Sequence, residues 1–410
     1  MTKVIGIDLG TTFSAIASLD DLGNPEVLAS IEDNRKITAS AVYLKNNEVI
    51  VGDKALTYLK DQSNNVILQT KREMENDVVY STDQGKWVSD TDLVDAYTPA
   101  QVSALILKKL KEYTSDVKKV VITVPAMFAE KARQATLDAA KIADLEVIEL
   151  INEPTAAVLH YASLPGVEVG GRVMIFDLGG GTFDVTFAEV KNKKVDVLTS
   201  RGDKYLGGRD FDNEITKLMK KKYFDIHNVE IDIENNKQYL HKAEEIKKIL
   251  SVKDKANIEI NGPKGLQKIE ITQDEFEESI QTYIEKIKML IEEAMDASGM
   301  NPSRINQTLL VGGSTRMPII TNGYSLTENY LKKNEGLFKA DSIRISLYGV
   351  DEDSYEFITR VKKGFNQVKN NTINFLNLRN KKNKNLKFGF NFIIIPENLN
   401  QLLEIPNLIS

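Results

Sequence analysis

The chain has 410 residues and a formal net charge of -6; 42% of its residues are hydrophobic and 27% are charged. These values are typical of a soluble globular protein with two or three cores, and they give no basic surface for nucleic acid. The chain has no cysteine, which excludes disulfides and thiolate metal sites. Its histidines, His160, His227 and His241, are far apart in the sequence and indicate no metal site.

The first residues run directly into an apolar stretch, with no secretory leader, and no long apolar span follows. We therefore expect a cytoplasmic protein that binds neither nucleic acid nor a membrane.

Residues 5–14, IGIDLGTTFS, place a carboxylate and a glycine turn after an apolar stretch. This pattern predicts a strand, a tight turn and a returning strand. Gly10 lets the backbone approach a ligand closely, and the amides of Gly10, Thr11 and Thr12 can face one anion. Asp8 is placed to hold the hydration shell of a magnesium ion. A glycine hairpin inside a buried sheet explains the same residues about as well.

The polar stretch up to about residue 97 has a mixed composition that indicates an inserted subdomain, about residues 37–97. It contains Lys71 in the sequence KREM. On these residues alone, Lys71 is predicted to be a surface lysine.

Residues 98–157 alternate between helical and extended patterns. Thr98-Pro99 predicts a helix start, residues 119–125 and 146–150 predict strands, and residues 127–143 predict a helix. This alternation predicts a mostly parallel sheet covered on both faces, with its chemistry at the carboxyl ends of strands. Glu153 follows a strand and can face the same cleft as Asp8. It can equally be a carboxylate that is favoured at a helix N-terminus.

Residues 174–185, MIFDLGGGTFDV, repeat the first motif around Asp177. Two strand–carboxylate–glycine turns in one chain imply a duplicated fold that closes on one ligand from both sides. We expect that ligand to be a nucleotide phosphate.

The second half contains a glycine pair at residues 207–208 that opens a helix, and a helix from about residue 237. Glu244, Lys247 and Ser251 share one face of the latter, either as a solvated face or as a wall for a base and ribose. Residues 258–260 and 269–271 predict half-exposed strands, and a capping box at residues 272–275 predicts a helix to about residue 297. A strand at residues 307–311 leads into GGSTR, where Arg316 could lie against a base.

Taken together, these segments resemble the nucleotide-binding domain of the DnaK-type heat-shock chaperones, the seventy-kilodalton heat-shock family. The likeness rests on VPAMF with RQAT (124–136), INEPTAA (151–157), the turn at 177–184, GGRDFD (207–212) and GGSTR (312–316). It implies a duplicated actin-like α/β ATPase fold with a nucleotide cleft. The implied domains are a first lobe (1–170, with the insertion at about 37–97) and a second lobe (171–320, with an insertion at about 208–305).

The resemblance also implies a reaction and site residues: hydrolysis of ATP to ADP with Mg²⁺, aided by K⁺, in a protein-folding and stress-response chaperone. It assigns metal binding to Asp8, Asp177 and Asp184, and catalysis to Lys71, Glu153, Asp177 and Thr182. It assigns nucleotide binding to Gly10, Thr11, Thr12, Phe13, Gly179, Gly180, Gly181, Glu244, Lys247, Ser251, Gly312, Gly313, Ser314 and Arg316. Pro125 and Arg133 match a relay toward the substrate domain. We expect a monomer whose partners are nucleotide, a J-domain co-chaperone and a nucleotide-exchange factor.

The resemblance stops near residue 320. The duplication predicts a closing helix after the strand at 307–311, and no such segment is recognisable from residue 321 onward, nor is a peptide-binding domain. Residues 341–349, 352–378 and 386–395 predict a strand, a helix and a strand. Residues 323–410 resemble an internal fragment of a radical S-adenosylmethionine barrel without its cysteines. We expect a C-terminal β-α-β segment unrelated to the lobes.

Two alternative functions remain open at this point. The incomplete second lobe could leave a truncated or chimeric module that is catalytically inactive. A sugar or acid kinase of the same superfamily is the other alternative, although the pattern at residues 244–251 and the VPA sequence favour the chaperone.

Overall fold

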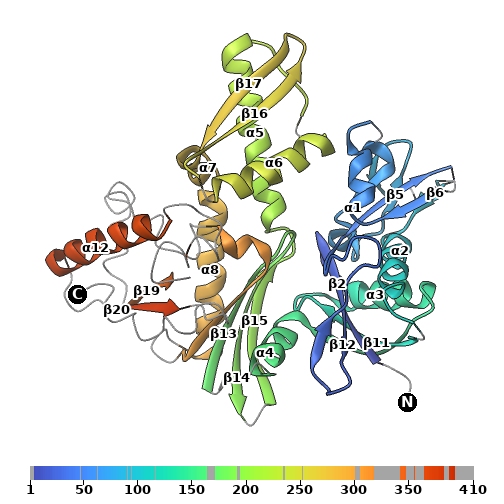
Figure 1. Cartoon of the computed structure of the whole chain (residues 1–410), viewed down its shortest axis with the longest axis horizontal. Coiled ribbons are helices and arrows are strands. Elements are labelled where there is room, and N and C mark those ends of the chain that lie inside the picture. Colours follow the sequence, from blue (N-terminus) through green and yellow to red (C-terminus); the bar gives the residue numbers. More distant parts are fainter. Residues whose placement is uncertain are drawn as a thin grey trace. The chain divides into compact units, whose positions relative to one another are not determined.

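Two β-hairpins, each built around one of the glycine turns, organise the fold. Strand β1 (Val4–Asp8) pairs antiparallel with β2 (Phe13–Leu19), and β13 (Gly171–Leu178) pairs antiparallel with β14 (Phe183–Lys191). Each first strand also has a parallel neighbour, which is β11 (Lys119–Val124) for β1 and β18 (Gln307–Val311) for β13. Because the same arrangement occurs twice, the duplication predicted from the sequence is confirmed (Figure 1).

The computed structural model describes residues 4–46, 48–61, 63–89, 91–93, 95–115, 117–163, 171–191, 194–233, 236–251, 253–300, 305–317, 342–347, 355, 364–382 and 387–392. The chain divides into two units. The first holds residues 1–247, 257–271 and 278–314, and the second holds residues 248–256, 272–277 and 315–410. Within the first unit, we call residues 4–163 the first lobe and the residues from 171 onward the second lobe.

The first lobe is built on a sheet with the strand order β12-β11-β1-β2-β3, in which β4 also pairs with β2. The pairs β12–β11 and β11–β1 are parallel, whereas β1–β2, β2–β3 and β2–β4 are antiparallel. The sheet is therefore mixed, and the prediction of a mostly parallel sheet is wrong because β2 pairs antiparallel with β1, β3 and β4. The further elements of this sheet are β3 (Pro25–Val27), β4 (Thr38–Ala39) and β12 (Glu146–Asn152).

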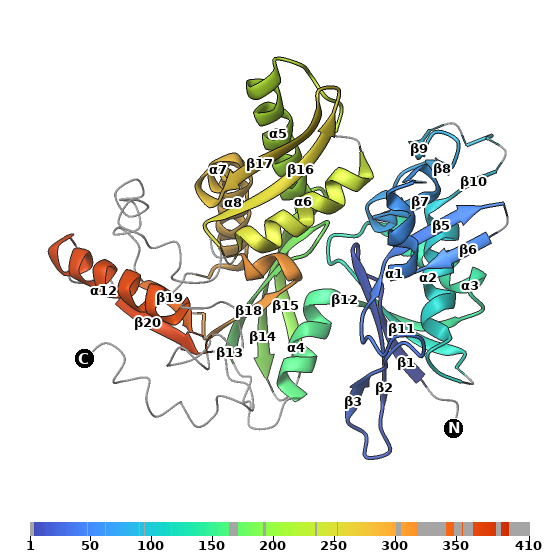
Figure 2. The ribbon, with the colours of Figure 1, turned by 45° about the horizontal axis from the view of Figure 1, so that its top comes forward.

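Helices α2 (Pro99–Lys111) and α3 (Glu130–Ile142) pack together beside this sheet (Figure 2). Thr98 caps α2 in a full capping box with Gln101, and Pro99 occupies the first helical position, where its missing N–H costs nothing. Ile106 and Leu107 of α2 join Ile5, Ile7 and Ile122 of the strands in one buried cluster. Burial of apolar area on both sides of this contact stabilises the lobe.

The insertion between β4 and α2 carries two small three-stranded sheets, with orders β6-β5-β7 and β10-β8-β9. Its elements are β5 (Ala41–Lys45), β6 (Glu48–Val51), α1 (Asp53–Leu56), η1 (Thr57–Leu59), η2 (Ser63–Asn65), β7 (Val66–Leu68), η3 (Thr70–Glu73), β8 (Val79–Ser81), β9 (Lys86–Val88) and β10 (Ala96–Tyr97).

Helix α4 (Glu153–Ser163) belongs to the packing of both lobes. It contacts β11 and β12 of the first sheet and also β13, β15 and β18 of the second (Figure 2). Val158 of α4 is fully buried in a cluster with Val173 and Ile175 of β13. Since Glu153 is the first residue of α4, this packing fixes Glu153 where the two lobes meet.

The second sheet has the order β15-β14-β13-β18. Helix α5 begins at Gly208 within the glycine pair, as predicted, and α6 begins at Lys237. The elements here are β15 (Lys194–Asp203), α5 (Gly208–His227), α6 (Lys237–Leu250), β16 (Lys255–Gly262), β17 (Gly265–Thr272) and α8 (Gln281–Ser298). Alternating residues of β16 are buried and exposed, so the half-exposed strand predicted there is confirmed.

In the second unit, a helix start that was predicted from the sequence is confirmed. The capping box at Thr272 and Glu275 forms and starts α7 (Gln273–Ser279). The single long helix predicted there is wrong, because α7 ends before Ile280 and α8 begins after it. No glycine or proline marks this break in the sequence.

Near the C-terminus, β19 (Ser342–Leu347) and β20 (Lys387–Phe392) pair in parallel, and α12 (Gly364–Lys382) lies between them in the sequence. The predicted strand–helix–strand order is therefore confirmed. Residues 348–354 and 356–363, which carry most of the barrel resemblance and the predicted helix start, lie outside the described residues. Among the helices that the structure describes, none combines the length and apolar character that crossing a membrane requires.

Candidate active site

The two glycine turns lie against each other. A Cβ added to Gly181 would lie 2.5 Å from Thr11 Cγ2, and one added to Gly180 would collide with Thr12 Oγ1. A side chain at either position of the second turn would therefore force the opposing threonine to move. The backbone amides of both turns consequently line one small region, which is the arrangement that anionic oxygens favour.

Side-chain hydroxyls hold the first turn in place. Ser14 Oγ accepts a hydrogen bond from the Gly10 amide at 3.2 Å, and Ser40 Oγ donates one to the Gly10 carbonyl oxygen at 2.8 Å. At the end of β1, Thr123 Oγ1 donates a hydrogen bond to Asp8 Oδ1 at 2.8 Å. Asp8 itself is exposed. The carboxylate is thus oriented by β11 while it stays open to solvent.

The second turn is fixed by the loop after β18. Ser314 Oγ donates a hydrogen bond to the Gly179 carbonyl oxygen at 3.0 Å. Gly312 has φ of 87°, a value that favours glycine, and a Cβ there would lie 2.8 Å from Asp177 Oδ1. The predicted residues Gly179, Gly180, Gly181, Gly312 and Ser314 are therefore brought together beside Asp177. Thr182 is half-buried in the same turn, whereas Gly313 is exposed and Phe13 is 37% exposed at the start of β2.

Lys71 and Glu153 form an ion pair beside the two turns. Their side chains are 8% and 16% exposed, so the prediction from local composition that Lys71 lies on the surface is wrong. Burial acts to lower the pKa of Lys71, but the carboxylates of Glu153, Asp8 and Asp177 hold this pKa above its usual value. Lys71 is therefore a protonated ammonium, which pairs with Glu153 and is further stabilised by the charges of Asp8 and Asp177 when these are ionised.

Asp177 and Asp184 have unusual environments. Burial, reinforced by Glu153 and Asp184, raises the pKa of Asp177 to about 8. Burial and the charge of Glu153 raise the pKa of Asp184 to about 7, and Glu153 itself has a pKa raised by burial against the opposing charge of Lys71. Asp184 Oδ1 is buried and has no hydrogen-bond partner among the described residues. Such crowded carboxyl groups are typical of sites that receive a cation.

Lys247 of α6 is buried, contrary to the solvated-face alternative. Its Nζ lies 2.8 Å from Asp212 Oδ1 and donates a hydrogen bond to the Gly208 carbonyl oxygen at 2.8 Å. Burial raises the pKa of Asp212 to about 6, although Lys247 opposes this shift. Glu244 is half-buried one turn earlier on α6. Two further residues predicted for nucleotide binding, Ser251 and Arg316, belong to the second unit, and the side chain of Arg316 lies outside the described residues.

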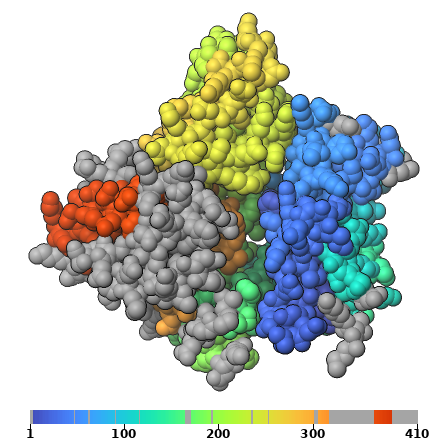
Figure 3. Space-filling model, viewed as in Figure 1, coloured from blue at the N-terminus to red at the C-terminus, as the bar shows by residue number. Residues whose placement is uncertain are grey.

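Another residue of α6 contacts the first lobe. Lys237 Nζ donates hydrogen bonds to the Val66 carbonyl oxygen, at 2.8 Å, and to the Tyr80 hydroxyl. Figure 3 shows the yellow-green surface of this part of the chain beside the blue surface of the first lobe. Burial lowers the pKa of Lys237 to about 7, and Arg209 adds to this effect. No motif in the sequence indicates a role for this lysine.

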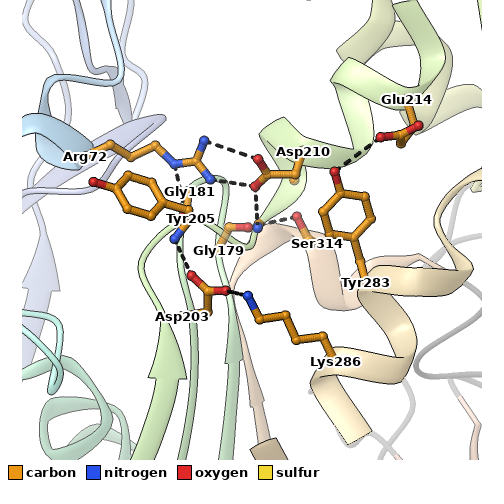
Figure 4. Close-up of polar contacts among 12 residues, drawn as sticks. Arg72, Gly179, Gly181, Asp203, Tyr205, Asp210, Glu214, Tyr283, Lys286 and Ser314 are labelled. Atoms are coloured by element: carbon orange, nitrogen blue, oxygen red, sulfur yellow. Dashed lines mark hydrogen bonds and ion pairs between the residues drawn. The ribbon is translucent and has the colours of Figure 1, made fainter. Parts of the chain in front are cut away.

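Arg72 and Asp210 are further residues to which sequence analysis gave no role. Arg72 Nε donates a hydrogen bond to the Gly181 carbonyl oxygen at 2.9 Å, and Arg72 Nη2 lies 2.5 Å from Asp210 Oδ2 (Figure 4). The signals in the sequence were the position of Arg72 beside Lys71, and Asp210 three residues after Gly207, the spacing of a capping box.

The predicted relay residue Arg133 also contacts the edge of the site. Arg133 Nε donates a hydrogen bond to the Phe128 carbonyl oxygen at 3.0 Å, and Nη2 donates one to Asn152 Oδ1 at 2.7 Å. The Phe128 amide in turn donates to the Pro125 carbonyl oxygen at 3.1 Å. Arg133 therefore connects the turn at residues 125–128 to the residue that precedes Glu153.

Comparisons with known proteins agree with this geometry. The sequence model of the family described as "Hsp70 protein" matches residues 4–336, beyond the boundary near residue 320 that the motifs suggested. The chain is 36% identical over 350 residues to a protein named "Chaperone protein dnaK" from Trieres chinensis, covering 78% of this chain and 56% of that protein. It is also 36% identical over 348 residues to the protein of the same name from Thalassiosira pseudonana, covering 78% and 57%.

The chain thus spans somewhat more than half the length of the curated relatives it matches. The family match covers most of the chain, including both glycine turns, the Lys71–Glu153 pair and α6. It agrees with the duplicated α/β fold and with the DnaK-type resemblance. The chain belongs to the Hsp70 family.

Proposed function

We propose that the chain binds ATP with Mg²⁺ between its two glycine turns and hydrolyses it to ADP and phosphate. The observation that carries this proposal is the contact between the turns of Thr11–Thr12 and Gly180–Gly181, with the buried Lys71–Glu153 pair beside it. Phosphoryl transfer needs positioning and neutralisation of charge more than covalent catalysis, and these residues supply both.

The residues present fit a magnesium ion held mainly through water. Asp8 is exposed at the edge of the site, and Asp184 Oδ1 is a buried acceptor that lacks a partner among the described residues. Within the described part of the chain, no three His, Cys, Asp or Glu side chains are arranged as direct ligands of one metal. Magnesium commonly keeps several waters and binds one or two carboxylates plus phosphate oxygens. When bound, the ion would neutralise charge on the phosphates, with Asp8 and Asp177 holding its waters and Asp184 serving an accompanying K⁺.

The protein's own residues would then perform separate tasks. The amides of Thr11, Thr12, Gly180 and Gly181 bind the phosphates. The amides of Gly10 and Gly179 already donate to Ser14 Oγ and to the Thr182 carbonyl oxygen. Lys71 stays protonated and places a positive charge next to them, because three carboxylates hold its pKa high. Glu153 is held in place by Lys71 and by the packing of α4, so its carboxylate can orient the attacking water. Lys247 and Glu244 would face the adenosine.

Calorimetric titration of the chain with ATP and Mg²⁺, followed by a single-turnover hydrolysis assay, tests this proposal. Wild-type protein should bind and hydrolyse ATP, while Lys71→Ala and Glu153→Ala should bind it and hydrolyse it on the order of 100-fold more slowly. Gly6→Ala is a matched control, since a Cβ at Gly6 meets nothing within 4 Å and Gly6 lies outside both turns. No heat and no thermal shift with ATP would refute the proposal.

A catalytically inactive, nucleotide-binding module is the second candidate. Among the described residues, β18 pairs only with β13, whereas its counterpart in the first lobe, β11, pairs with β12 as well as β1. The same two assays separate the candidates, because an inactive module binds ATP without hydrolysing it. The chaperone family membership disfavours a sugar kinase. We further propose co-chaperone binding and a cytoplasmic location by analogy with the family.

A further inference from the structure

Arg72 connects the two lobes beside Lys71, and the role we assign to it rests on the proposed ATPase function. Lys71 and Arg72 are consecutive residues of the short helix η3, which follows Gln69 in a left-handed conformation with φ of 58°. Their side chains go to different partners. Lys71 pairs with Glu153 of the first lobe, and Arg72 reaches residues of the second lobe. The position of one side chain therefore constrains the other.

Arg72 is bonded to the second lobe through two groups. Its Nε donates to the Gly181 carbonyl oxygen at 2.9 Å, and its two terminal nitrogens lie 2.5 Å and 3.4 Å from the two oxygens of Asp210. The Arg72 and Asp210 side chains are only 11% and 13% exposed. Figure 4 shows the guanidinium directed at both partners. A fork of this kind fixes orientation as well as distance, which a single ammonium does not.

The partners of Arg72 form one fixed unit with the second glycine turn, Gly179–Gly181, which we call the phosphate turn. Asp210 Oδ2 accepts a hydrogen bond from the Gly207 amide at 2.8 Å, which caps α5. The amides of Gly208 and Arg209 donate to the carbonyl oxygens of Gly179 and Gly180 at 3.0 Å and 2.8 Å. The first turn of α5 and the phosphate turn therefore move together, and Arg72 is attached to both.

These bonds fix the position of η3, the short helix that carries Lys71, relative to the second lobe. We propose that Arg72 is a positioning residue that sets Lys71 and its partner Glu153 relative to the phosphate turn, so that the pair is placed correctly only when the two lobes are together. Arg72 does not touch the reacting atoms in this proposal. It acts through the backbone that it shares with Lys71.

A second contact between the same segments provides a matched control. Lys204, in the turn between β15 and α5, forms an ion pair with Glu75 and lies beside Tyr205, over whose ring the guanidinium of Arg72 also lies at 6.0 Å. Lys204 crosses between the lobes as Arg72 does, but no bond between Lys204 and the phosphate turn or Asp210 is found among the described residues. Loss of Lys204 weakens the attachment of the lobes without releasing the phosphate turn.

The test compares Arg72→Lys, Arg72→Gln and Asp210→Asn with Lys204→Gln in the full chain. Three quantities are measured: the Kd for ADP with Mg²⁺, the single-turnover hydrolysis rate, and the rate at which an amine-acylating reagent modifies Lys71, located by peptide mass. For the first three variants we expect hydrolysis to fall about 100-fold, because a small misplacement of catalytic groups has that effect. Affinity for ADP should change less than about threefold, since Ser314, Gly208 and Arg209 still hold the phosphate turn. Lys71 should become more reactive.

Lys204→Gln should remain within about twofold of wild type in all three measurements, as expected for a half-exposed ion pair. Equal losses for the Arg72 and Lys204 variants would overturn the proposal in favour of general attachment of the lobes. Full activity of Arg72→Lys would overturn it as well, and so would unchanged reactivity of Lys71. If wild-type protein fails to hydrolyse ATP, the proposed function fails, and the reactivity of Lys71 still decides the role of Arg72.

Discussion

Lys71 and Glu153 are 82 positions apart in the sequence, and their side chains form a buried ion pair at the junction of the two lobes. Lys71 comes from a short helix in the insertion, and Glu153 is the first residue of α4. Because α4 packs on both sheets, the pair connects the insertion to the centre of the fold. A contact of this kind is sensitive to the loss of either partner.

Removing one partner should cost more stability than removing both. Lys71→Met leaves the Glu153 carboxylate buried without its cation, and we expect the free energy of unfolding to fall by roughly 3 kcal/mol. In the double variant Lys71→Met/Glu153→Gln no buried charge of the pair remains, so part of this loss should be recovered. Urea unfolding of both single variants and the double variant measures the coupling. Additive losses would show that the two side chains do not interact.

The contact between the glycine turns predicts a steric effect on nucleotide binding. Gly180→Ala places a methyl group against Thr12 Oγ1, so the turns must move apart, and we expect ATP affinity to fall about tenfold. Thr12→Ala in the same chain removes the obstructing hydroxyl and should restore part of the loss. Gly6→Ala, with open space at its Cβ, should bind ATP as wild type does. Titration of the four proteins would contradict this geometry if Gly180→Ala bound normally.

The turns could be predicted from the sequence because their signals are local. An apolar run, a carboxylate and adjacent glycines specify a hairpin regardless of what packs around it, and the second copy around Asp177 confirms the interpretation internally. The start of α2 was predictable for the same reason, since Thr98 and Pro99 act within one turn of the helix.

The environment of Lys71 could not be predicted from its neighbours, because the residue that buries and pairs it lies 82 positions away. The same holds for Arg72, whose partners are 109 and 138 positions away. Sheet direction failed in part: β1 and β2 form the predicted hairpin, but β3 and β4 join β2 as further antiparallel strands, which the alternation of helices and strands around β11 and β12 does not indicate. A catalytic role for Lys71 is a prediction from the family resemblance alone, since its neighbours in the sequence indicate none.

Asp8→Asn tests the negative charge of this residue, because the variant removes the charge and keeps the position of the side chain. The asparagine Oδ1 can still accept the hydrogen bond from Thr123 Oγ1, so the end of β1 should keep its structure while losing a negative charge. Wild-type ATP affinity should fall when EDTA removes Mg²⁺, and in Asp8→Asn this dependence should be weaker because the carboxylate that we propose holds the hydrated ion is gone.

Thr123→Val is the matched control for Asp8, since it removes the hydroxyl that orients the carboxylate and retains the charge. We expect it to keep most of the Mg²⁺ dependence. Titrations with and without EDTA would contradict the metal assignment if wild type and Asp8→Asn responded equally.

Lys237 predicts a pH dependence of the contact between α6 and the first lobe. Its pKa is about 7 in the folded protein, against an ordinary value of 10.5, because burial disfavours the charged form. Between these two values the unfolded chain binds more protons than the folded one, so this residue's contribution to stability should rise with pH from about 7 to about 10. Neutral Lys237 still donates hydrogen bonds to Val66 and Tyr80, so the contact is favoured above pH 7.

Thermal unfolding of wild type and Lys237→Met at pH 6.5 and pH 8.5 measures this pH dependence. The unfolding temperature of wild type should exceed that of Lys237→Met by more at pH 8.5 than at pH 6.5. An equal gain at both values would show that Lys237 keeps its ordinary pKa and that its ammonium is accommodated at the contact.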